Sequence, residues 1–314
     1  MTARLVQVMQ NREVPAPARR DAGHLLGRLG WEPEGGLDVW IEIPPGPFLY
    51  GEEKERQVIA RAYRIGKYPV TNKQFARVIE AHGYNRRECW SAEGWAWRTG
   101  TYDSKAPGWL QDQLKNRPPK ERDRPFWWGD ERLSSPLCPV VGVSWFEAEA
   151  YCRWLALEAG LDPDGPAAHR LPTEEQWERA VRGVDGREYP WGNTWDRLRL
   201  NCAEWWAGRD LPEWDDLKAW WESQQYKEAN PTPTAIAAFP DGAGPAGLWD
   251  ASGNVWEWCN PRSREEQWYP LRGGSWYTLR RKCRCACRFD DVPGDFSVKV
   301  GFRVAFPGPR PSAF

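Results

Sequence analysis

The chain has 314 residues, and its 43 Lys and Arg residues nearly balance its 44 Asp and Glu residues, which gives a net charge of −1. A nearly neutral chain lacks the basic surface that nucleic-acid binding requires, and no apolar run is long enough to span a bilayer. We therefore expect no nucleic acid partner and no membrane span. Residues 1–20 contain no apolar stretch of the secretory type, so a cytoplasmic location is expected.

Tryptophan, glycine and proline are abundant, with 23, 29 and 28 residues. Glycine and proline mark turns, and each tryptophan can bury a large apolar area. The composition therefore predicts a loop-rich fold held together by tryptophan packing. The eight cysteines are too few for a disulfide scaffold, and we expect them to be mostly reduced.

In chain order, residues 1–36 form a polar arm with room for one short helix, which we expect to pack on the surface of the main domain. Residues 37–306 are expected to form that single domain, and residues 307–314 a frayed tail. Two tryptophan-rich stretches, at about 85–139 and 203–232, interrupt the domain. Unstructured loops of that length are uncommon in a compact domain unless they carry function, so we interpret both as insertions.

Three segments carry the signature of a helix N-terminus. Each begins with Ser or Thr, has Glu or Gln three residues later, and continues with apolar residues at helical spacing: Thr71–Gln74, Ser144–Glu147 and Thr173–Gln176. In such a capping box the first side chain accepts a hydrogen bond from the fourth amide, and the fourth side chain reaches back to the first amide. The pattern predicts three helices of the scaffold.

Short alternating or β-branched stretches predict strands at both ends of the domain. They are Val39–Ile43, Phe48–Gly51 and Ala60–Ile65, followed near the C-terminus by Val255–Trp258, Leu271–Ser275, Cys283–Arg288 and Val300–Phe306. Side chains alternate along a strand, so Cys283, Cys285 and Cys287 are expected on one face. We interpret them as small residues that are buried or face a ligand, because their spacing is a weak metal signal.

A set of motifs in a fixed order carries a resemblance to a known family. They are Ile43–Phe48, Tyr68–Asn72, Pro139–Trp145, Arg170–Glu178, Tyr189–Asn193, Gly247–Trp258, Leu271–Trp276 and Gly301–Arg303. From about Trp40 to Phe306 the chain resembles the formylglycine-generating-enzyme, or sulfatase-modifying factor, family. The resemblance implies an α+β, C-type-lectin-like fold with low regular secondary structure and long loops.

The resemblance leaves several functions open, because a fold does not fix an activity. Some members of the family oxidise a substrate cysteine with a copper-binding pair of cysteines. Others are iron enzymes of thiol-histidine synthesis that use a histidine triad. A third group comprises variable proteins of diversity-generating retroelements, which present a hypervariable surface to a ligand, and many members are uncharacterised regulatory or effector modules.

Both enzyme functions fit the sequence poorly. In the oxidases a cysteine closely follows a Gly-Gly-Ser-aromatic stretch and a second comes five residues later, but here these positions are Thr278 and Cys283. Two soft thiolates are needed to hold Cu(I), so no copper is expected, and a degenerate oxidase is the alternative interpretation. The histidines His24, His82 and His169 form no local cluster, so no iron is expected either.

One loop resembles a calcium loop of the family. Asp250 and Glu257 would supply carboxylate oxygens, and the carbonyls of Gly253 and Val255 would add two more. Ca²⁺ prefers about six to eight oxygen ligands in a flexible shell. We therefore expect Ca²⁺ at these four residues. The alternative is a loop that hydrogen bonds alone hold in shape, with Asn254 capping a turn.

The segment Trp276–Phe306 favours the retroelement variable proteins. Its fixed positions, from the Gly-Gly-Ser-Trp motif to the Gly-Phe-Arg motif, have the spacing found in that group. Diversified positions in that group derive from Asn codons changed only at adenines, which cannot yield Trp, Glu, Gln, Met or Lys. After Trp276 the chain contains none of the first four, although Lys282 and Lys299 do not fit the rule.

The sequence therefore predicts a non-enzymatic, ligand-binding variable protein whose partner is an unidentified protein or surface molecule. Its candidate contact residues lie between the fixed positions. They are Tyr277, Thr278, Leu279, Arg280, Lys282, Cys285, Cys287, Phe289, Asp290, Asp291, Val292, Gly294, Asp295, Phe296, Ser297, Val298 and Lys299. We expect Tyr277–Leu279 and Phe289–Lys299 to meet on one exposed surface.

Fixed residues are expected to hold that surface in place. Gly273 and Gly274 would permit close approach of the backbone. Arg284, Arg288 and Arg303 would act as rigid anchors, because a guanidinium offers several hydrogen-bond donors in a fixed plane.

Overall fold

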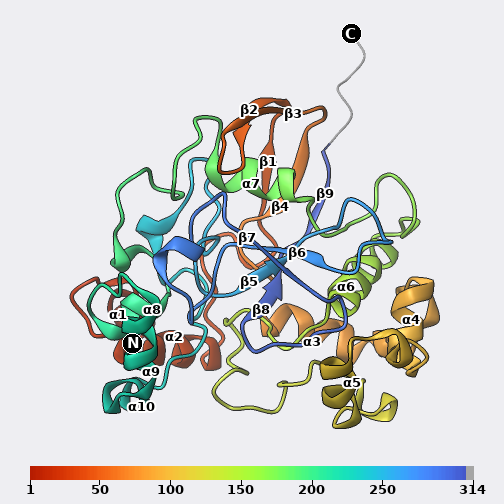
Figure 1. The fold of residues 1–314 in the computed structure, drawn as a ribbon, viewed down its shortest axis with the longest axis horizontal. Coiled ribbons are helices and arrows are strands. Elements are labelled where there is room, and N and C mark those ends of the chain that lie inside the picture. The colour runs from red at the N-terminus through yellow and green to blue at the C-terminus, as the bar shows by residue number, and fades with distance from the viewer. Residues whose placement is uncertain (309–314) are drawn as a thin grey trace.

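The computed structural model describes residues 1–308 of the chain. Within them lie ten α-helices and nine short strands (Figure 1). The helices are α1 (Thr2–Gln10), α2 (Ala16–Arg28), α3 (Asn72–Glu80), α4 (Ala92–Thr99), α5 (Gly108–Lys115), α6 (Trp145–Glu158), α7 (Glu174–Arg182), α8 (Ala203–Ala207), α9 (Trp214–Glu222) and α10 (Gln224–Ala229). The strands are β1 (Trp40–Ile43), β2 (Gly46–Tyr50), β3 (Glu55–Ile59), β4 (Tyr63–Gly66), β5 (Trp256–Trp258), β6 (Tyr269–Arg272), β7 (Arg288–Asp291), β8 (Val300–Phe302) and β9 (Ala305–Pro307).

The strands of residues 1–308 form three small sheets. β1, β4 and β9 make one with β4 in the centre, β2 and β3 form a hairpin, and the C-terminal strands follow the order β7-β6-β5-β8. β5 and β8 run parallel, whereas the other neighbours in that sheet are antiparallel. Figure 1 shows this four-stranded sheet in the middle of the molecule with helices around it, which confirms the α+β class.

All three predicted scaffold helices are confirmed together with their caps. Helices α3, α6 and α7 begin after Thr71, Ser144 and Thr173, and each has both hydrogen bonds of a capping box. The apolar residues of α6 pack into the main core with Trp258 and Phe302 of the central sheet. The caps therefore fix where each helix starts and which side chains reach the core.

The N-terminal arm contains two helices, α1 and α2, and not the single one that the sequence predicts. Arg19 of α2 is buried and donates hydrogen bonds to the carbonyls of Met9 (2.7 Å) and Ala238 (2.6 Å). Its guanidinium carbon also lies 4.5 Å from the ring centroid of Phe239. The arm is thus fastened to the chain that follows the second insertion, and Figure 1 shows α1 and α2 beside α8–α10.

Both tryptophan-rich insertions contain helices. The first supplies α4 and α5 and the second α8, α9 and α10, on opposite sides of the molecule in Figure 1. Trp90 and Trp97 of the first are buried in the main core. Trp205, Trp206 and Trp220 of the second pack with the arm in a separate cluster. Tryptophan packing therefore ties each insertion to the domain.

The predicted strand Cys283–Arg288 is wrong. A 3₁₀ turn precedes Cys283, the amide of Cys287 donates back to the carbonyl of Arg284 (3.0 Å), and β7 begins only at Arg288. Because a turn does not keep alternate side chains on one face, the thiols of Cys283, Cys285 and Cys287 enter three different core clusters.

Two smaller differences concern the ends of the domain. Strand β3 has no counterpart among the predicted strands and completes the hairpin with β2. Of the residues assigned to the tail by the sequence, Pro307 pairs with Tyr63 in β9 and the amide of Gly308 donates to the carbonyl of Ala62 (3.0 Å), whereas residues 309–314 lie outside the described residues. Among the helices of residues 1–308, none combines the length and the apolar character needed to cross a membrane.

Candidate ligand-binding site

A pocket of about 340 Å³ lies where distant parts of the C-terminal segment meet. The residues of this segment that line it are Tyr277, Thr278, Leu279, Arg281, Lys282, Phe289, Asp291, Ser297, Lys299 and Val300. Trp256 and Leu271 of the central sheet and Trp214, Leu217 and Trp221 of α9 complete the lining. The structure therefore brings the segments Tyr277–Leu279 and Phe289–Lys299 together.

Glycines behind the pocket explain why the backbone can take this course. Gly274 has a φ of +78°, and a Cβ atom there would lie 2.7 Å from the sulfur of Cys283. Gly273 has a φ of +97°, and a Cβ atom there would lie 2.6 Å from the carbonyl oxygen of Ala251. Glycine alone combines this left-handed backbone with such close approach, so the prediction for both glycines is confirmed.

The three fixed arginines are held by carboxylates. Arg284 pairs with Glu52 (2.7 Å) and Arg288 with Glu174 (2.9 Å), so each ties the C-terminal segment to another part of the chain. Arg303 is fully buried and also forms an ion pair. Planar guanidinium groups with several bonds each are suited to fix the frame.

Thr278 lines the pocket and contacts Cys283. Its Oγ1 lies 3.6 Å from the sulfur of Cys283, accepts a hydrogen bond from the amide of Ser275 (2.9 Å) and donates to the carbonyl of Ser275 (3.0 Å). Burial raises the pKa of the Cys283 thiol far above its ordinary value. The two positions therefore offer at most one thiolate, and that one is hard to form, whereas a two-coordinate Cu(I) site needs two.

The histidines do not form an iron site. His24 lies in α2, His82 follows α3, and His169 lies beside the ring of Phe306. Within residues 1–308 no group of three or more His, Cys, Asp or Glu side chains is arranged to hold a metal ion. The absence of an iron cofactor stays a prediction.

Comparison with known proteins agrees with the fold and the motifs. Residues 31–307 match the family model described as "Sulfatase-modifying factor enzyme 1-like domain". The chain belongs to this family. The match spans the whole predicted domain, residues 37–306, including the two stretches interpreted as insertions.

Curated relatives in the family carry names of both inactive and active proteins. "Inactive C-alpha-formylglycine-generating enzyme 2" of Bos taurus is 29% identical over 301 residues, which cover 89% of this chain and 88% of the relative. "Formylglycine-generating enzyme" of Thermomonospora curvata is 30% identical over 316 residues, which cover 84% of this chain and 92% of the relative. Because the two identities are so close, overall similarity does not distinguish an active from an inactive protein. The residues at the site must make that distinction.

Solved structures of the same fold include "Treponema denticola variable protein 1" and "PvdO from Pseudomonas aeruginosa". The first has a TM-score of 0.51 and 18% identity, and covers 86% of this chain and 95% of its own. The second has a TM-score of 0.54 and 16% identity, and covers 86% of this chain and 94% of its own. At such identities the likeness shows the fold alone.

The predicted contact residues divide into two groups in the structure. Those that reach the surface are Tyr277, Thr278, Arg280, Lys282, Phe289, Asp290, Asp291, Ser297, Val298 and Lys299. Those that are buried are Leu279, Cys285, Cys287, Val292, Gly294, Asp295 and Phe296. Leu279 nevertheless lines this pocket, and Asp295 and Phe296 line a neighbouring one.

For the other four buried residues, the prediction that they contact a ligand is wrong. Cys285 and Cys287 point into core clusters, as described above. Val292 packs with Leu110 of α5 in a small cluster of its own. Gly294 also lies against Leu110, because a Cβ atom there would be 3.1 Å from that side chain. The first insertion therefore covers this part of the loop.

The neighbouring pocket, of about 570 Å³, adjoins the first one and shares Asp291, Ser297 and Lys299 with it. Residues of the first insertion, including Trp109 and Trp127, form its other side. Burial, and secondly the charge of Asp295, raise the pKa of Asp291 to about 7. The ridge between the pockets therefore carries an acid that is partly protonated at neutral pH.

In the predicted calcium loop, Arg303 is already bound to the carboxylate of Glu257, one of the four expected calcium ligands. The carboxylate of Glu257 accepts hydrogen bonds from Nε and Nη2 of Arg303 (2.5 and 2.7 Å) and from Nε1 of Trp177 (2.7 Å). Asp250 instead accepts one from the amide of Ala237 (3.1 Å), and burial raises its pKa to about 7. Asp250 is thus the carboxylate of this loop whose charge a bound cation would neutralise. The calcium site stays a prediction.

Hydrogen bonds already hold the other half of that loop. Asn254, at a φ of +64°, accepts hydrogen bonds from the amide of Thr234 (2.9 Å) and the side chain of Asn201 (3.1 Å). Its own amide group donates to the carbonyl of Thr234 (3.2 Å). The loop therefore keeps its shape without a metal ion. Its residues fit Ca²⁺ only in part, because hydrogen bonds from the protein already engage one of the two carboxylates.

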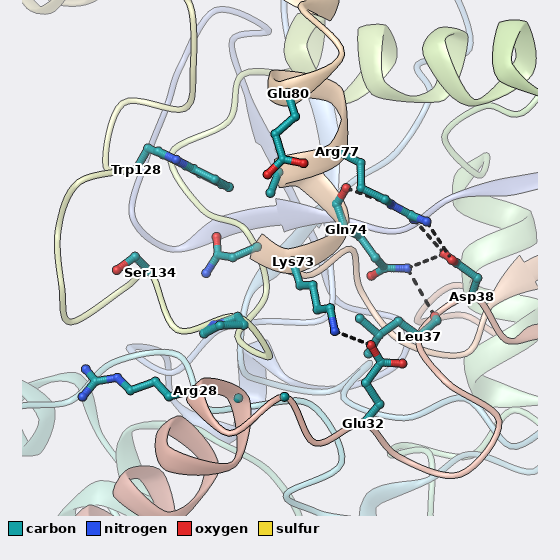
Figure 2. A pocket seen from close by; sticks show the side chains of 15 residues that line it. Arg28, Glu32, Leu37, Asp38, Lys73, Gln74, Arg77, Glu80, Trp128 and Ser134 are labelled. Carbon is teal, nitrogen blue, oxygen red and sulfur yellow. Dashed lines mark hydrogen bonds and ion pairs between the residues drawn. The ribbon is translucent and has the colours of Figure 1, made fainter.

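A further pocket, of about 560 Å³, lies between α3 and the arm (Figure 2). Figure 2 shows Lys73 reaching Glu32 (2.6 Å) and Arg77 reaching Asp38 (2.9 Å). These two ion pairs involve four of the six charged residues that line the pocket, the other two being Arg28 and Glu80, and Trp128 is its one aromatic lining residue. This hollow is better explained by the packing of the arm on the domain than by a ligand.

Sequence reasoning missed the part that α9 plays in the first pocket. Trp214, Leu217 and Trp221 line it from the second insertion. The density of tryptophan in that insertion was the available signal, because long loops in compact domains usually carry function. The signal did not show which surface the insertion would cover.

Proposed function

We propose that this protein is a non-catalytic ligand-binding member of the sulfatase-modifying factor family. Thr278 carries the proposal: it stands where an oxidase of the family has its first copper thiolate, and it lines a pocket built from the predicted contact residues. The name of the inactive relative in Bos taurus supports a family branch without catalysis.

The chemistry of the pocket also supports recognition. Phe289 and Trp214 are 45% and 49% exposed although both line the pocket. Large apolar side chains gathered in an exposed concavity mark interaction sites in soluble proteins. The expected partner is an unidentified protein or surface molecule.

We further propose that the chain is the variable protein of a diversity-generating retroelement. Support comes from the division of labour in the C-terminal segment. The fixed glycines and arginines are packed tightly or paired with carboxylates, while Tyr277, Phe289 and Ser297 lie at the pocket on loops or an edge strand. A rigid scaffold with changeable surface residues is the usual arrangement in binding domains.

Sequencing of the gene's neighbourhood tests the retroelement proposal. We expect a near-copy of the segment encoding Trp276–Phe306 that differs only at adenines, close to a reverse transcriptase gene. The differences should fall on surface codons such as those of Tyr277 and Phe289, and spare those of the fixed residues Arg284 and Arg303. A neighbourhood without such a copy contradicts the proposal and leaves a regulatory or effector module as the function.

A further inference from the structure

Aromatic rings enclose the pocket from two sides. Trp221 of α9 stacks on Tyr277, with centroids 4.2 Å apart and planes at 16°, and Trp214 stands perpendicular to Trp221 at 5.3 Å. On the side of the sheet, the rings of Trp256 and Phe289 have centroids 5.7 Å apart. Aromatic walls favour a flat apolar group, which gains from stacked and edge-to-face contacts.

The size of the pocket limits what can enter it. Its volume is about 340 Å³, at the lower end of the range of about 300–1,000 Å³ found for small-molecule sites. One large aromatic side chain suits this space better than a cofactor-sized molecule.

Basic side chains around the pocket lack acidic partners. Arg281, Lys282 and Lys299 line it against a single acid, Asp291. No carboxylate oxygen of residues 1–308 lies within 4.0 Å of the charged nitrogens of these three side chains. The ammonium of Lys299 lies instead 4.0 Å from the ring centroid of Tyr277. Arg281 and Lys282 thus carry positive charge that no carboxylate of the described residues pairs, whereas burial lowers the pKa of Lys299 and the charge of Asp295 partly offsets that effect.

Asp291 offsets this charge less than an ordinary aspartate would. Burial, and secondly the charge of Asp295, raise the pKa of Asp291 to about 7, so this carboxyl is less charged near neutral pH than an ordinary aspartate. Arg281 and Lys282 are exposed beside the pocket, so they can meet groups that flank a buried ring. A ligand that carries carboxylates next to its aromatic group would therefore form ion pairs with these basic side chains.

We infer that the pocket binds an aromatic side chain flanked by carboxylates, presented by an acidic segment of a partner polypeptide. The inference rests on the proposed function and adds the class of ligand. The ring would lie among Trp221, Tyr277 and Phe289. The flanking carboxylates would reach Arg281 and Lys282 at the rim, while Lys299 supplies positive charge within.

Calorimetric titration of the full chain with two end-blocked peptides, Glu-Glu-Trp-Glu-Glu and Lys-Lys-Trp-Lys-Lys, tests this inference. We expect the acidic peptide to bind at least about tenfold more tightly, because it forms ion pairs where the basic peptide meets like charges. The double variant Arg281→Gln and Lys282→Gln should lose about tenfold in affinity for the acidic peptide. Trp221→Ala should lose more, with an unchanged circular dichroism spectrum.

One control variant and three contrary outcomes make the test decisive. Arg56→Gln removes an exposed charge on β3, outside the pocket lining, and should leave the affinity unchanged. Equal or tighter binding of the basic peptide overturns the inference but leaves the pocket as a binding site. Tighter binding of free indole-3-propionate overturns the choice of a polypeptide ligand. If neither peptide binds, or if Trp221→Ala does not change the affinity, the inference is overturned completely. The proposed function is tested separately and fails if the protein is found to oxidise cysteine.

Discussion

Replacing Arg303 by Met is expected to lower the free energy of unfolding by about 3–5 kcal/mol. Arg303 and Glu257 are both fully buried, and the guanidinium forms two hydrogen bonds to the carboxylate. Without Arg303, Glu257 keeps only the hydrogen bond from Trp177 and becomes an unpaired charge in the core. The variant also loses the hydrogen bonds that Arg303 donates to the backbone carbonyls of Gly66, at the end of β4, and Trp249, before β5.

Urea denaturation measures this effect, and an exposed ion pair supplies the control. Arg64 pairs with Glu42 at 3.3 Å, and the two side chains are 41% and 54% exposed. Arg64→Met should therefore change the free energy of unfolding by about 0.5 kcal/mol or less. Equal effects of the two substitutions would contradict the role given to Arg303.

Replacing Asp250 by Asn is expected to stabilise the protein at pH 8 and to have little effect near pH 4. Burial raises the pKa of Asp250 to about 7, above its ordinary value of 3.8, so folding favours the protonated form. The wild type therefore has the full stability of this group below pH 4 and loses it as the pH rises to about 7. Asn stays neutral and can still accept the hydrogen bond from Ala237, so the gain at pH 8 is up to about 4 kcal/mol.

Melting temperatures of the wild type and Asp250→Asn at pH 4.5 and 8 test this, each with added Ca²⁺ and with EDTA. If Ca²⁺ binds the loop as the sequence predicts, it stabilises the wild type at pH 8 by mass action and narrows the gap to the variant. A melting temperature of the wild type that is the same in Ca²⁺ and EDTA contradicts the calcium site. A gap that does not change with pH contradicts the buried, uncompensated state of Asp250.

The frame of this protein could be predicted from its sequence because its signals are local. The capping boxes at Thr71, Ser144 and Thr173 depend on residues three apart, and all three form as expected. Gly273 and Gly274 likewise show their need for a special backbone conformation by their identity alone.

The contact surface was only partly predictable because tertiary packing decides which side chains face outward. Phe289 and Phe296 have the same chemistry, yet Phe289 is 45% exposed on an edge strand and Phe296 is buried against the first insertion. The alternation expected for Cys283, Cys285 and Cys287 failed because a turn replaced the strand. The contribution of Trp221 depends on where the second insertion folds back, which no local pattern encodes.

The proposed non-catalytic function rests on Thr278, which stands where the family resemblance places the first copper thiolate of the oxidases. The direct measurement is mass spectrometry of a cysteine-containing sulfatase-type peptide after incubation with the protein, Cu(I) and O₂. The wild type is predicted to form no aldehyde above the level of copper alone. Thr278→Cys, which restores two sulfurs at neighbouring positions, serves to show how much of the copper site survives. Aldehyde formation by the wild type would contradict the conclusion that the site binds a ligand and does not oxidise cysteine.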